Sequence, residues 1–281
     1  MVKKILAKTY IYLILLLMYL PILVLIAYSF SVETTMGDGY TFGFDLWQNL
    51  FNPETKISQE IWTALGNTLI VAIVSALVAT ILGTLGAIGA FYSRKKAQKV
   101  IELSTQIPVS NPEIVMALSL VVMFVALSVK FNFWTLLIGH VVLGLPFIYL
   151  SVKPKLIQMD PNLYEAALDL GCSPRQALGK VVVPQIMPGV LSGFLLSVTL
   201  SLDDFIVTAF TRGPGLLSGN KTIETLSTLI QAKLKKGAIP PEMRPLTLII
   251  FLVVLAVAIT LTVLRNKESN KIKERKGRQN A

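Results

Sequence analysis

Two adjacent carboxylates, Asp203 and Asp204, stand near the end of a long apolar run, in the sequence SLDDFIVTAF. A carboxylate inside a membrane is costly, so such residues usually face the interior of a helix bundle or a water-filled path. Successive helical residues point about 100° apart, so at least one of the two is expected to face a partner helix or a cavity. The residue types suit attraction of a cationic solute. The alternatives are a structural pairing with Arg212, or exposure at the outer interface.

Two other polar residues lie in apolar runs. Glu113 follows Asn111 and Pro112, which fit the N-cap and first position of a helix. The helix dipole favours an acid in that first turn. The alternative is that Pro108 and Pro112 break this run inside the membrane, where unwound helices often line solute sites. His140, the one histidine of the chain, is interpreted as a hydrogen-bonded packing residue.

The segment 160–184 carries charge, Gly and Pro between two apolar runs, yet it keeps a helical pattern. Asp160 and Pro161 fit the N-cap and first residue of a short helix. One narrow, Ala-rich apolar face follows, formed by Leu163, Ala166, Ala167 and Leu170. Gly171 is expected to end this helix, and Ser173 to begin a second one. Such a face permits close approach by another protein better than it anchors in lipid.

The amino-acid composition indicates the kind of protein to which these residues belong. The chain has 281 residues, of which 53% are hydrophobic and 15% are charged, and its mean hydropathy is +0.66. A soluble domain usually has about a quarter charged residues, so a bilayer is the expected solvent. The single cysteine, Cys172, excludes a disulfide framework and a cysteine-based metal cluster. The net charge is +10. Because the basic residues lie in the loops and tails between apolar runs, they are interpreted as a sign of membrane orientation, and no nucleic acid is expected as a partner.

Six apolar runs are long enough, or nearly so, to cross a bilayer, which takes about 20 residues. They lie at about 10–30, 63–92, 108–129, 133–152, 185–211 and 246–264. The sequence therefore predicts an all-α polytopic membrane protein with six transmembrane helices. In the second and fifth runs small residues recur every fourth position, which indicates close helix–helix contacts. These residues are Ser75, Ala79, Gly83 and Ala87, and Gly189, Gly193, Ser197 and Ser201.

The distribution of Lys and Arg predicts the orientation. The tails 1–9 and 265–281 and the loop 93–106 are basic, so both termini and this loop are expected in the cytoplasm. The loop 31–61 has five acids and one Lys, and is expected outside. The loop 212–245 departs from the rule, because it is basic although it should lie outside. It is expected to form a short amphipathic helix there.

The 160–184 segment also carries a spaced set of residues: Glu165, Ala166, Ala167, Gly171, Val181, Val183 and Pro184. This set resembles the EAA motif of importer-type ABC transporter permeases, which is EAA, three residues, Gly, nine residues, then Ile-x-Leu-Pro. The spacing agrees throughout, and valines replace the Ile and the Leu. The resemblance covers roughly residues 60–264 and implies a MetI-like ABC permease fold, with a permease core at 62–264.

By this resemblance the EAA segment docks on a cytoplasmic ATPase subunit. The coupling residues carried over are Glu165, Ala166, Ala167, Gly171 and Pro184, with Glu165 making polar contacts and Gly171 permitting the turn. The implied partners are a second homologous permease, a dimer of ATPases, an extracytoplasmic binding protein and the lipid bilayer of a prokaryotic plasma membrane. The chain has no Gly-x-x-x-x-Gly-Lys loop. ATP is therefore expected to be used by the partner, with no enzymatic activity, cofactor or metal on this chain.

Three shorter stretches resemble the spermidine/putrescine permeases of the PotC type. They are SLDDFIVTAF with the Gly-Pro-Gly that follows, Asn-Pro-Glu-Ile at 111–114, and Gly-Ala-Ile-Pro-Pro-Glu from 237. The implied solute is a polyamine, and Asp203, Asp204 and Glu113 are candidates for its path. The alternative is another small solute, such as ferric ion, thiamine or a phosphonate, and the phosphonate fits the two carboxylates poorly. An embedded enzyme lacks a nucleophile–base set, and a channel has no reason to carry an EAA segment.

Overall fold

The computed structural model describes residues 2–33, 39–160, 162–213, 222–237, 239–256 and 259. Apart from isolated bridge residues at Ser31, Phe42 and Thr222, its regular structure there is helical. The helices are α1 (Val2–Ser29), α2 (Asp45–Phe51), α3 (Lys56–Phe91), α4 (Lys95–Ser110), α5 (Glu113–Ala126), α6 (Phe133–Gln158), α7 (Asn162–Asp169), α8 (Pro174–Ala177), the π-helix η1 (Leu178–Val182), α9 (Val183–Asp203), α10 (Ile206–Thr211), α11 (Leu226–Lys235) and a last helix Met243–Ala256.

The chain forms two compact units, residues 62–236 and residues 1–61 with 237–281. In the unit made by the two ends of the chain, Arg244 holds the chain that follows α1. Its Nη1 donates to the carbonyl of Glu33 at 2.8 Å, and its guanidinium lies 5.9 Å from the ring centre of Tyr28. The two contacts join the start of the last helix to the last turn of α1 and to the residues just after it.

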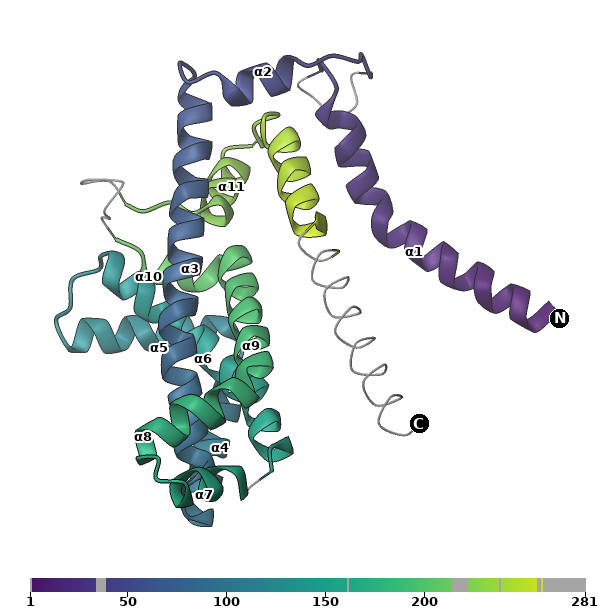
Figure 1. Cartoon of the computed structure of the whole chain (residues 1–281). Coiled ribbons are helices and arrows are strands. Elements are labelled where there is room, and N and C mark those ends of the chain that lie inside the picture. Colours follow the sequence, from purple (N-terminus) through teal and green to yellow (C-terminus); the bar gives the residue numbers. More distant parts are fainter. Residues whose placement is uncertain are drawn as a thin grey trace. The chain divides into compact units, whose positions relative to one another are not determined.

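The unit 62–236 contains the candidate site, and its core is the packing of α6 on α9 and α3 (Figure 1). A methyl group on Gly193 would lie 3.0 Å from the Cα of Ile148, and one on Gly83 would lie 2.9 Å from the Ile148 side chain. The two predicted rows of small residues are buried, as close helix contact requires. The prediction that they mark helix–helix contacts is confirmed.

The predicted spans are met in part. Within the described residues, four stretches are long and apolar enough to cross a membrane, namely Lys8–Ser29, Lys56–Phe91, Phe133–Gln158 and Pro174–Asp203. A fifth is added if α4 and α5 together count as one span. The predicted last span, 246–264, coincides with the helix Met243–Ala256 in its first half, and most of its second half lies outside the described residues. The count of six stays a prediction.

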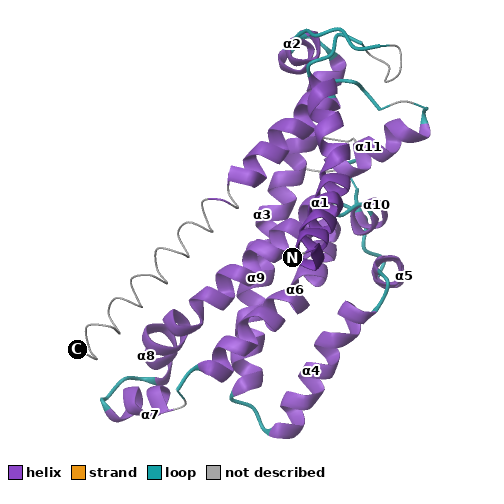
Figure 2. Ribbon diagram, turned by 90° about the vertical axis from the view of Figure 1, so that its right-hand side faces the viewer, coloured by secondary structure: helices purple, strands orange, loops and turns teal. Residues whose placement is uncertain are grey.

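The apolar run 108–129 is divided between two helices, as the alternative of a break at its prolines predicted; Pro108 lies within α4, and the break is at Pro112. Helix α4 ends at Ser110, α5 begins at Glu113, and their axes meet at 109° (Figure 2). Pro112 has no N–H to donate and disfavours the helical conformation of the residue before it. Asn111 is accordingly extended, with φ −83° and ψ 144°. The helix start is also one residue later than expected, because Pro112 rather than Asn111 is the N-cap.

The helix expected over 185–211 is interrupted as well. Helix α9 ends at Asp203, and Asp204 is extended with φ −60° and ψ 126°. The short helix α10 then begins at Ile206. The two expected carboxylates therefore lie at a break between helices, whereas the sequence pattern indicated the outer part of one helix.

Candidate functional site

Asp204 is buried, and its carboxylate accepts hydrogen bonds from residues of α10. Oδ1 accepts from the backbone N–H of Val207 at 3.1 Å, and Oδ2 accepts from the backbone N–H and the hydroxyl of Thr208, each at 2.8 Å. Asp204 thus caps the N–H groups that the first turn of α10 cannot pair internally. The pairing with Arg212 is not formed. Instead, Arg212 Nη1 donates to the carbonyl of Ile223 at 3.4 Å.

Asp203 points elsewhere, because its side chain is exposed while that of Asp204 is buried. The expectation that at least one of the pair faces a partner helix is met by Asp204. Glu113, half-buried at the start of α5, lies close enough to interact with the carboxyls of both Asp203 and Asp204. Helices α5 and α10 pack together and bring these acids, 90 or so residues apart in the chain, to one place. All three candidates for the solute path are therefore neighbours.

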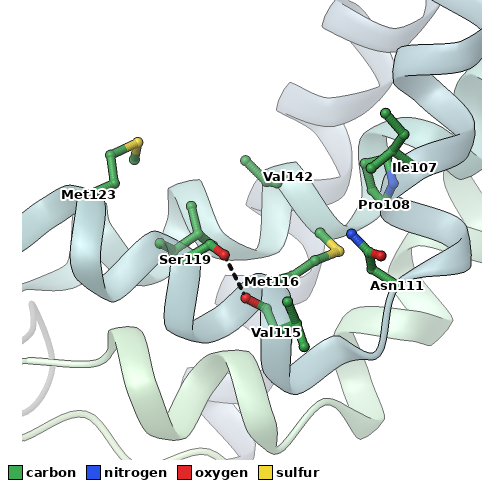
Figure 3. A pocket seen from close by; sticks show the side chains of 9 residues that line it. Ile107, Pro108, Asn111, Val115, Met116, Ser119, Met123 and Val142 are labelled. Atoms are coloured by element: carbon green, nitrogen blue, oxygen red, sulfur yellow. Dashed lines mark hydrogen bonds between the residues drawn. The ribbon is translucent and has the colours of Figure 1, made fainter.

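Two shallow cavities lie at the break between α4 and α5. One has a volume of about 200 Å³ and is lined by Pro108, Val109, Asn111, Glu113, Met116, Leu143, Pro146, Phe147 and Leu200. The other, of about 290 Å³, is lined by Ile107, Pro108, Asn111, Val115, Met116, Ser119, Leu120, Met123 and Val142 (Figure 3). Their walls are mostly apolar, with one carboxylate in the smaller cavity. This combination suits a solute that carries positive charge on an apolar chain.

His140 is hydrogen-bonded inside the unit, which confirms its interpretation as a packing residue. Its Nδ1 lies 2.7 Å from the hydroxyl of Ser201, and its Nε2 lies 2.9 Å from the hydroxyl of Thr208 and 3.5 Å from Asp204 Oδ2. The sequence pattern did not link it to Asp204. The available signal was the pair of hydroxyl residues, Ser201 and Thr208, three before and four after Asp204 in an otherwise apolar run.

The segment 160–184 forms the expected helix, turn and second helix. Helix α7 ends in a Schellman turn, in which Cys172 N donates to the carbonyl of Ala167 at 3.0 Å and Gly171 N to that of Leu168 at 2.9 Å. Gly171 has φ +86°, a conformation that favours glycine. Helix α8 then begins with a capping box between Ser173 and Gln176. Residue 161, expected as the first helical residue, lies outside the described part of the chain.

The apolar face expected on α7 is divided between two surroundings. Ala167 is buried, and the ring of Tyr164 lies 5.1 Å from that of Tyr92 at the end of α3. Glu165 and Ala166 are exposed, and Leu170 is 86% exposed. One side of α7 therefore packs on the rest of the unit 62–236, and the other side is exposed.

Pro184 stands at the second position of α9, directly after the π-helix η1. Because proline donates no N–H, the regular i to i−4 ladder cannot pass through it. The preceding turn is widened, and Val183 N donates five residues back to the carbonyl of Leu178. The segment 160–184 thus leads into α9 through an irregular turn.

Residues 79–267 match the protein family described as the binding-protein-dependent transport system inner membrane component. The match covers more than half of the chain. The chain belongs to this family. It is therefore a permease, a multi-pass membrane subunit of a transport system rather than an enzyme. Among the residues that the structure describes, this permease has no group of three His, Cys, Asp or Glu side chains that could hold a metal ion.

Several relatives resemble the permease over most of its length. The spermidine/putrescine transport system permease protein PotC of Haemophilus influenzae is 31% identical over 253 residues, 90% of this chain and 93% of that protein. PotC of Escherichia coli K12 is 33% identical over 242 residues, 86% of this chain and 87% of that protein. The putrescine transport system permease protein PotI of the same strain is 29% identical over 243 residues, 83% of this chain and 81% of that protein.

Two solved structures confirm the fold class. The bacterial ABC transporter involved in import of the acidic polysaccharide alginate aligns with a TM-score of 0.66 at 16% identity, covering 94% of this chain and 96% of that one. The MetNI methionine ABC transporter aligns with a TM-score of 0.56 at 19% identity, covering 74% of this chain and 95% of that one. The permease thus has the all-α fold of ABC importer permeases expected from its EAA segment.

Proposed function

We propose that this permease forms the translocation path of an ATP-driven importer for polyamines, spermidine or putrescine. The observation that carries the proposal is the meeting of Glu113, Asp203 and Asp204 beside the cavities at the α4–α5 break. Support for the solute class comes from the relatives, which are named as spermidine/putrescine and putrescine permeases.

The chemistry of these residues matches a polyamine, which consists of protonated amines joined by short methylene chains. Asp203 is exposed and Glu113 is half-buried, so both carboxyls can reach a passing cation. The apolar walls around Pro108 and Met116 suit the methylene chain between two amines. A phosphonate would be repelled by the same acids, which is why it fits this path less well than a cation does.

The EAA segment is proposed as the coupling site. The partners would be a second homologous permease, a dimer of cytoplasmic ATPases and an extracytoplasmic binding protein. Both termini would then be cytoplasmic, with 31–61 outside. The exposed side of α7, with Glu165, Ala166 and Leu170, is available for docking in an ATPase cleft. ATP-driven closure would move this helix, and the Tyr164–Tyr92 contact would carry the movement to α3.

Uptake measurements test the solute. Cells lacking this permease and any other polyamine system should accumulate labelled spermidine or putrescine only when the gene is restored. An excess of unlabelled spermidine should compete, whereas thiamine, ferric citrate and a phosphonate should not. Restored uptake of one of those three solutes, without restored polyamine uptake, would replace the proposal with the corresponding alternative.

A second experiment tests coupling. Glu165→Ala and Gly171→Ala should abolish uptake while the complete transporter remains assembled and hydrolyses ATP, because the docking contact or the turn is lost. Alanine at Gly171 meets no neighbour within 4 Å, so its effect is confined to the strained backbone. Asp169→Ala, an exposed acid on the same helix, is the control. Full uptake in both test variants would show that coupling lies elsewhere.

A further inference from the structure

A buried chain of hydrogen bonds crosses the break between α9 and α10. His140 of α6 is 1% exposed, and it touches Ser201 on α9 and Thr208 on α10, one on each side of the break. Ser201 in turn lies 3.4 Å from the hydroxyl of Ser75 on α3. Four helices therefore meet in one polar contact that the solute path proposed above does not use.

The direction of each hydrogen bond follows from the groups present. The hydroxyl proton of Thr208 is donated to Asp204 Oδ2, because a carboxylate can only accept. The Thr208 oxygen therefore accepts from His140 Nε2, which must carry the ring proton. Nδ1 of the neutral ring is then an acceptor and takes the hydroxyl proton of Ser201. One neutral tautomer satisfies the whole chain, from Ser201 to Asp204.

Helix α10 is short, and its anchors to α6 are few. The hydroxyl of Thr135 donates to the carbonyl of Thr211 at 2.9 Å, at the end of α10. Gly139 lies against Val207 so closely that an added methyl group would lie 2.7 Å from its Cγ1. His140 supplies the contact at Thr208, next to the cap that Asp204 makes. Its loss would leave the start of α10 without a polar link to α6.

We propose that His140 is a positioning residue for solute transport, because its Nε2–H holds α10 in the place where Asp204 is turned inward. The two acids then have separate tasks, since Asp204 is bound to α10 and Asp203 is left exposed to the solute. This proposal rests on the proposed function for its transport effect. The geometry of the break does not depend on which solute passes.

Two conservative substitutions separate the two ring nitrogens. The amide of His140→Gln reaches the position of Nε2 and can donate to Thr208, whereas the amide of His140→Asn reaches the position of Nδ1 and contacts only Ser201. His140→Leu removes both contacts and serves as the null variant. If it fails to assemble, the comparison of Gln with Asn still decides the question.

Transport kinetics are measured in the complete transporter reconstituted in vesicles, per assembled complex. We expect His140→Gln to keep the apparent KM for spermidine near that of the wild type. His140→Asn should raise it about two- to tenfold, the effect of one hydrogen bond to a buried group. Equal KM values in the two variants would overturn the positioning role. So would a loss confined to the amount of complex or to Vmax.

Amide hydrogen exchange gives a readout that needs no solute. In the same complex the amides of Val207 and Thr208 are capped by Asp204 and should exchange slowly. Exchange over 206–211 should be faster in His140→Asn and unchanged in His140→Gln. If polyamine uptake is absent altogether, this difference still supports the role of His140 while the proposed function fails. Identical exchange in the two variants would overturn the inference whatever the solute.

Discussion

Two apolar runs of this permease are interrupted, and the interruptions have different causes. The break between α4 and α5 follows from Pro112, which acts on the backbone of its own neighbours. The break between α9 and α10 has no proline. It follows from Asp204, whose carboxylate offers the N–H groups of α10 a better partner than a continued helix would. The α4–α5 break is thus caused by the backbone of Pro112, and the α9–α10 break depends on the buried side chain of Asp204.

The surroundings of the two breaks differ accordingly. The start of α5 has no side-chain cap, and cavities open beside it. The start of α10 is held by Asp204 and, through Thr208, by His140. A proline bends the chain without filling the space that the bend creates. A buried carboxylate must have all its partners in place, so the structure around it is closely packed.

The largest expected effect is that of Asp204→Ala. It removes the carboxylate that caps α10 and so leaves the buried N–H groups of Val207 and Thr208 without an acceptor, at a cost of about 1–3 kcal/mol. The purified transporter should lose thermal stability, and uptake should fall to background. Asp203→Ala is the matched control for thermal stability, because its side chain is exposed. If both variants were equally stable, the α9–α10 break would not depend on the Asp204 cap.

Gly139→Ala tests how closely α6 must approach α10. The added methyl group would lie 2.7 Å from Val207 Cγ1 and 3.1 Å from Thr211 Oγ1, so α10 must move. Overpacking of this kind costs about 1–3 kcal/mol, and we expect a lower melting temperature and reduced uptake. Gly86→Ala is the control, because no atom lies within 4 Å of its added methyl group. Equal melting temperatures would show that α10 has room to adjust.

Pro112→Ala should act on the other break at little cost in stability. Alanine restores an N–H and lets Asn111 become helical, so the bend between α4 and α5 should open. Spin labels at Val100 and Val122, both exposed, measure this, because a straight helix would separate them by about 33 Å. We expect the distance to lengthen and uptake to fall several-fold in intact complexes. An unchanged distance would mean that packing on α10 holds the bend.

Asp203→Asn should have the smallest effect on the fold, within about 0.5 kcal/mol, because the side chain is exposed. Its expected effect is on the solute alone, as a raised apparent KM for spermidine uptake at unchanged complex yield. Asp169→Asn, an exposed acid on α7, is the matched control. A KM equal to that of the wild type would remove Asp203 from the proposed path.

Much of the architecture follows from local sequence patterns. The rows Ser75–Ala87 and Gly189–Ser201 place their small residues at helical spacing, and the contacts they indicate are formed. The Gly171 turn and the capping box at Ser173 depend on neighbouring residues only, and both are present. In contrast, the continuous helix expected over 185–211 was wrong, because apolar character persists through a break that a capping side chain makes. For 108–129 the sequence left open a break at its prolines, and the break forms at Pro112.

Features of this chain that depend on neighbouring residues could be predicted from the sequence, whereas features that depend on contacts between distant segments could not. Residue types and spacing determined the membrane class, the EAA segment, and the presence of carboxylates in apolar runs, because each of these depends on neighbours within a few turns. The fate of each carboxylate was decided by folding. Asp204 is buried and Asp203 exposed because His140 and Thr208, 68 residues apart, meet beside Asp204. A contact between two distant segments produces no repeating residue pattern in either segment, so the sequence does not predict it.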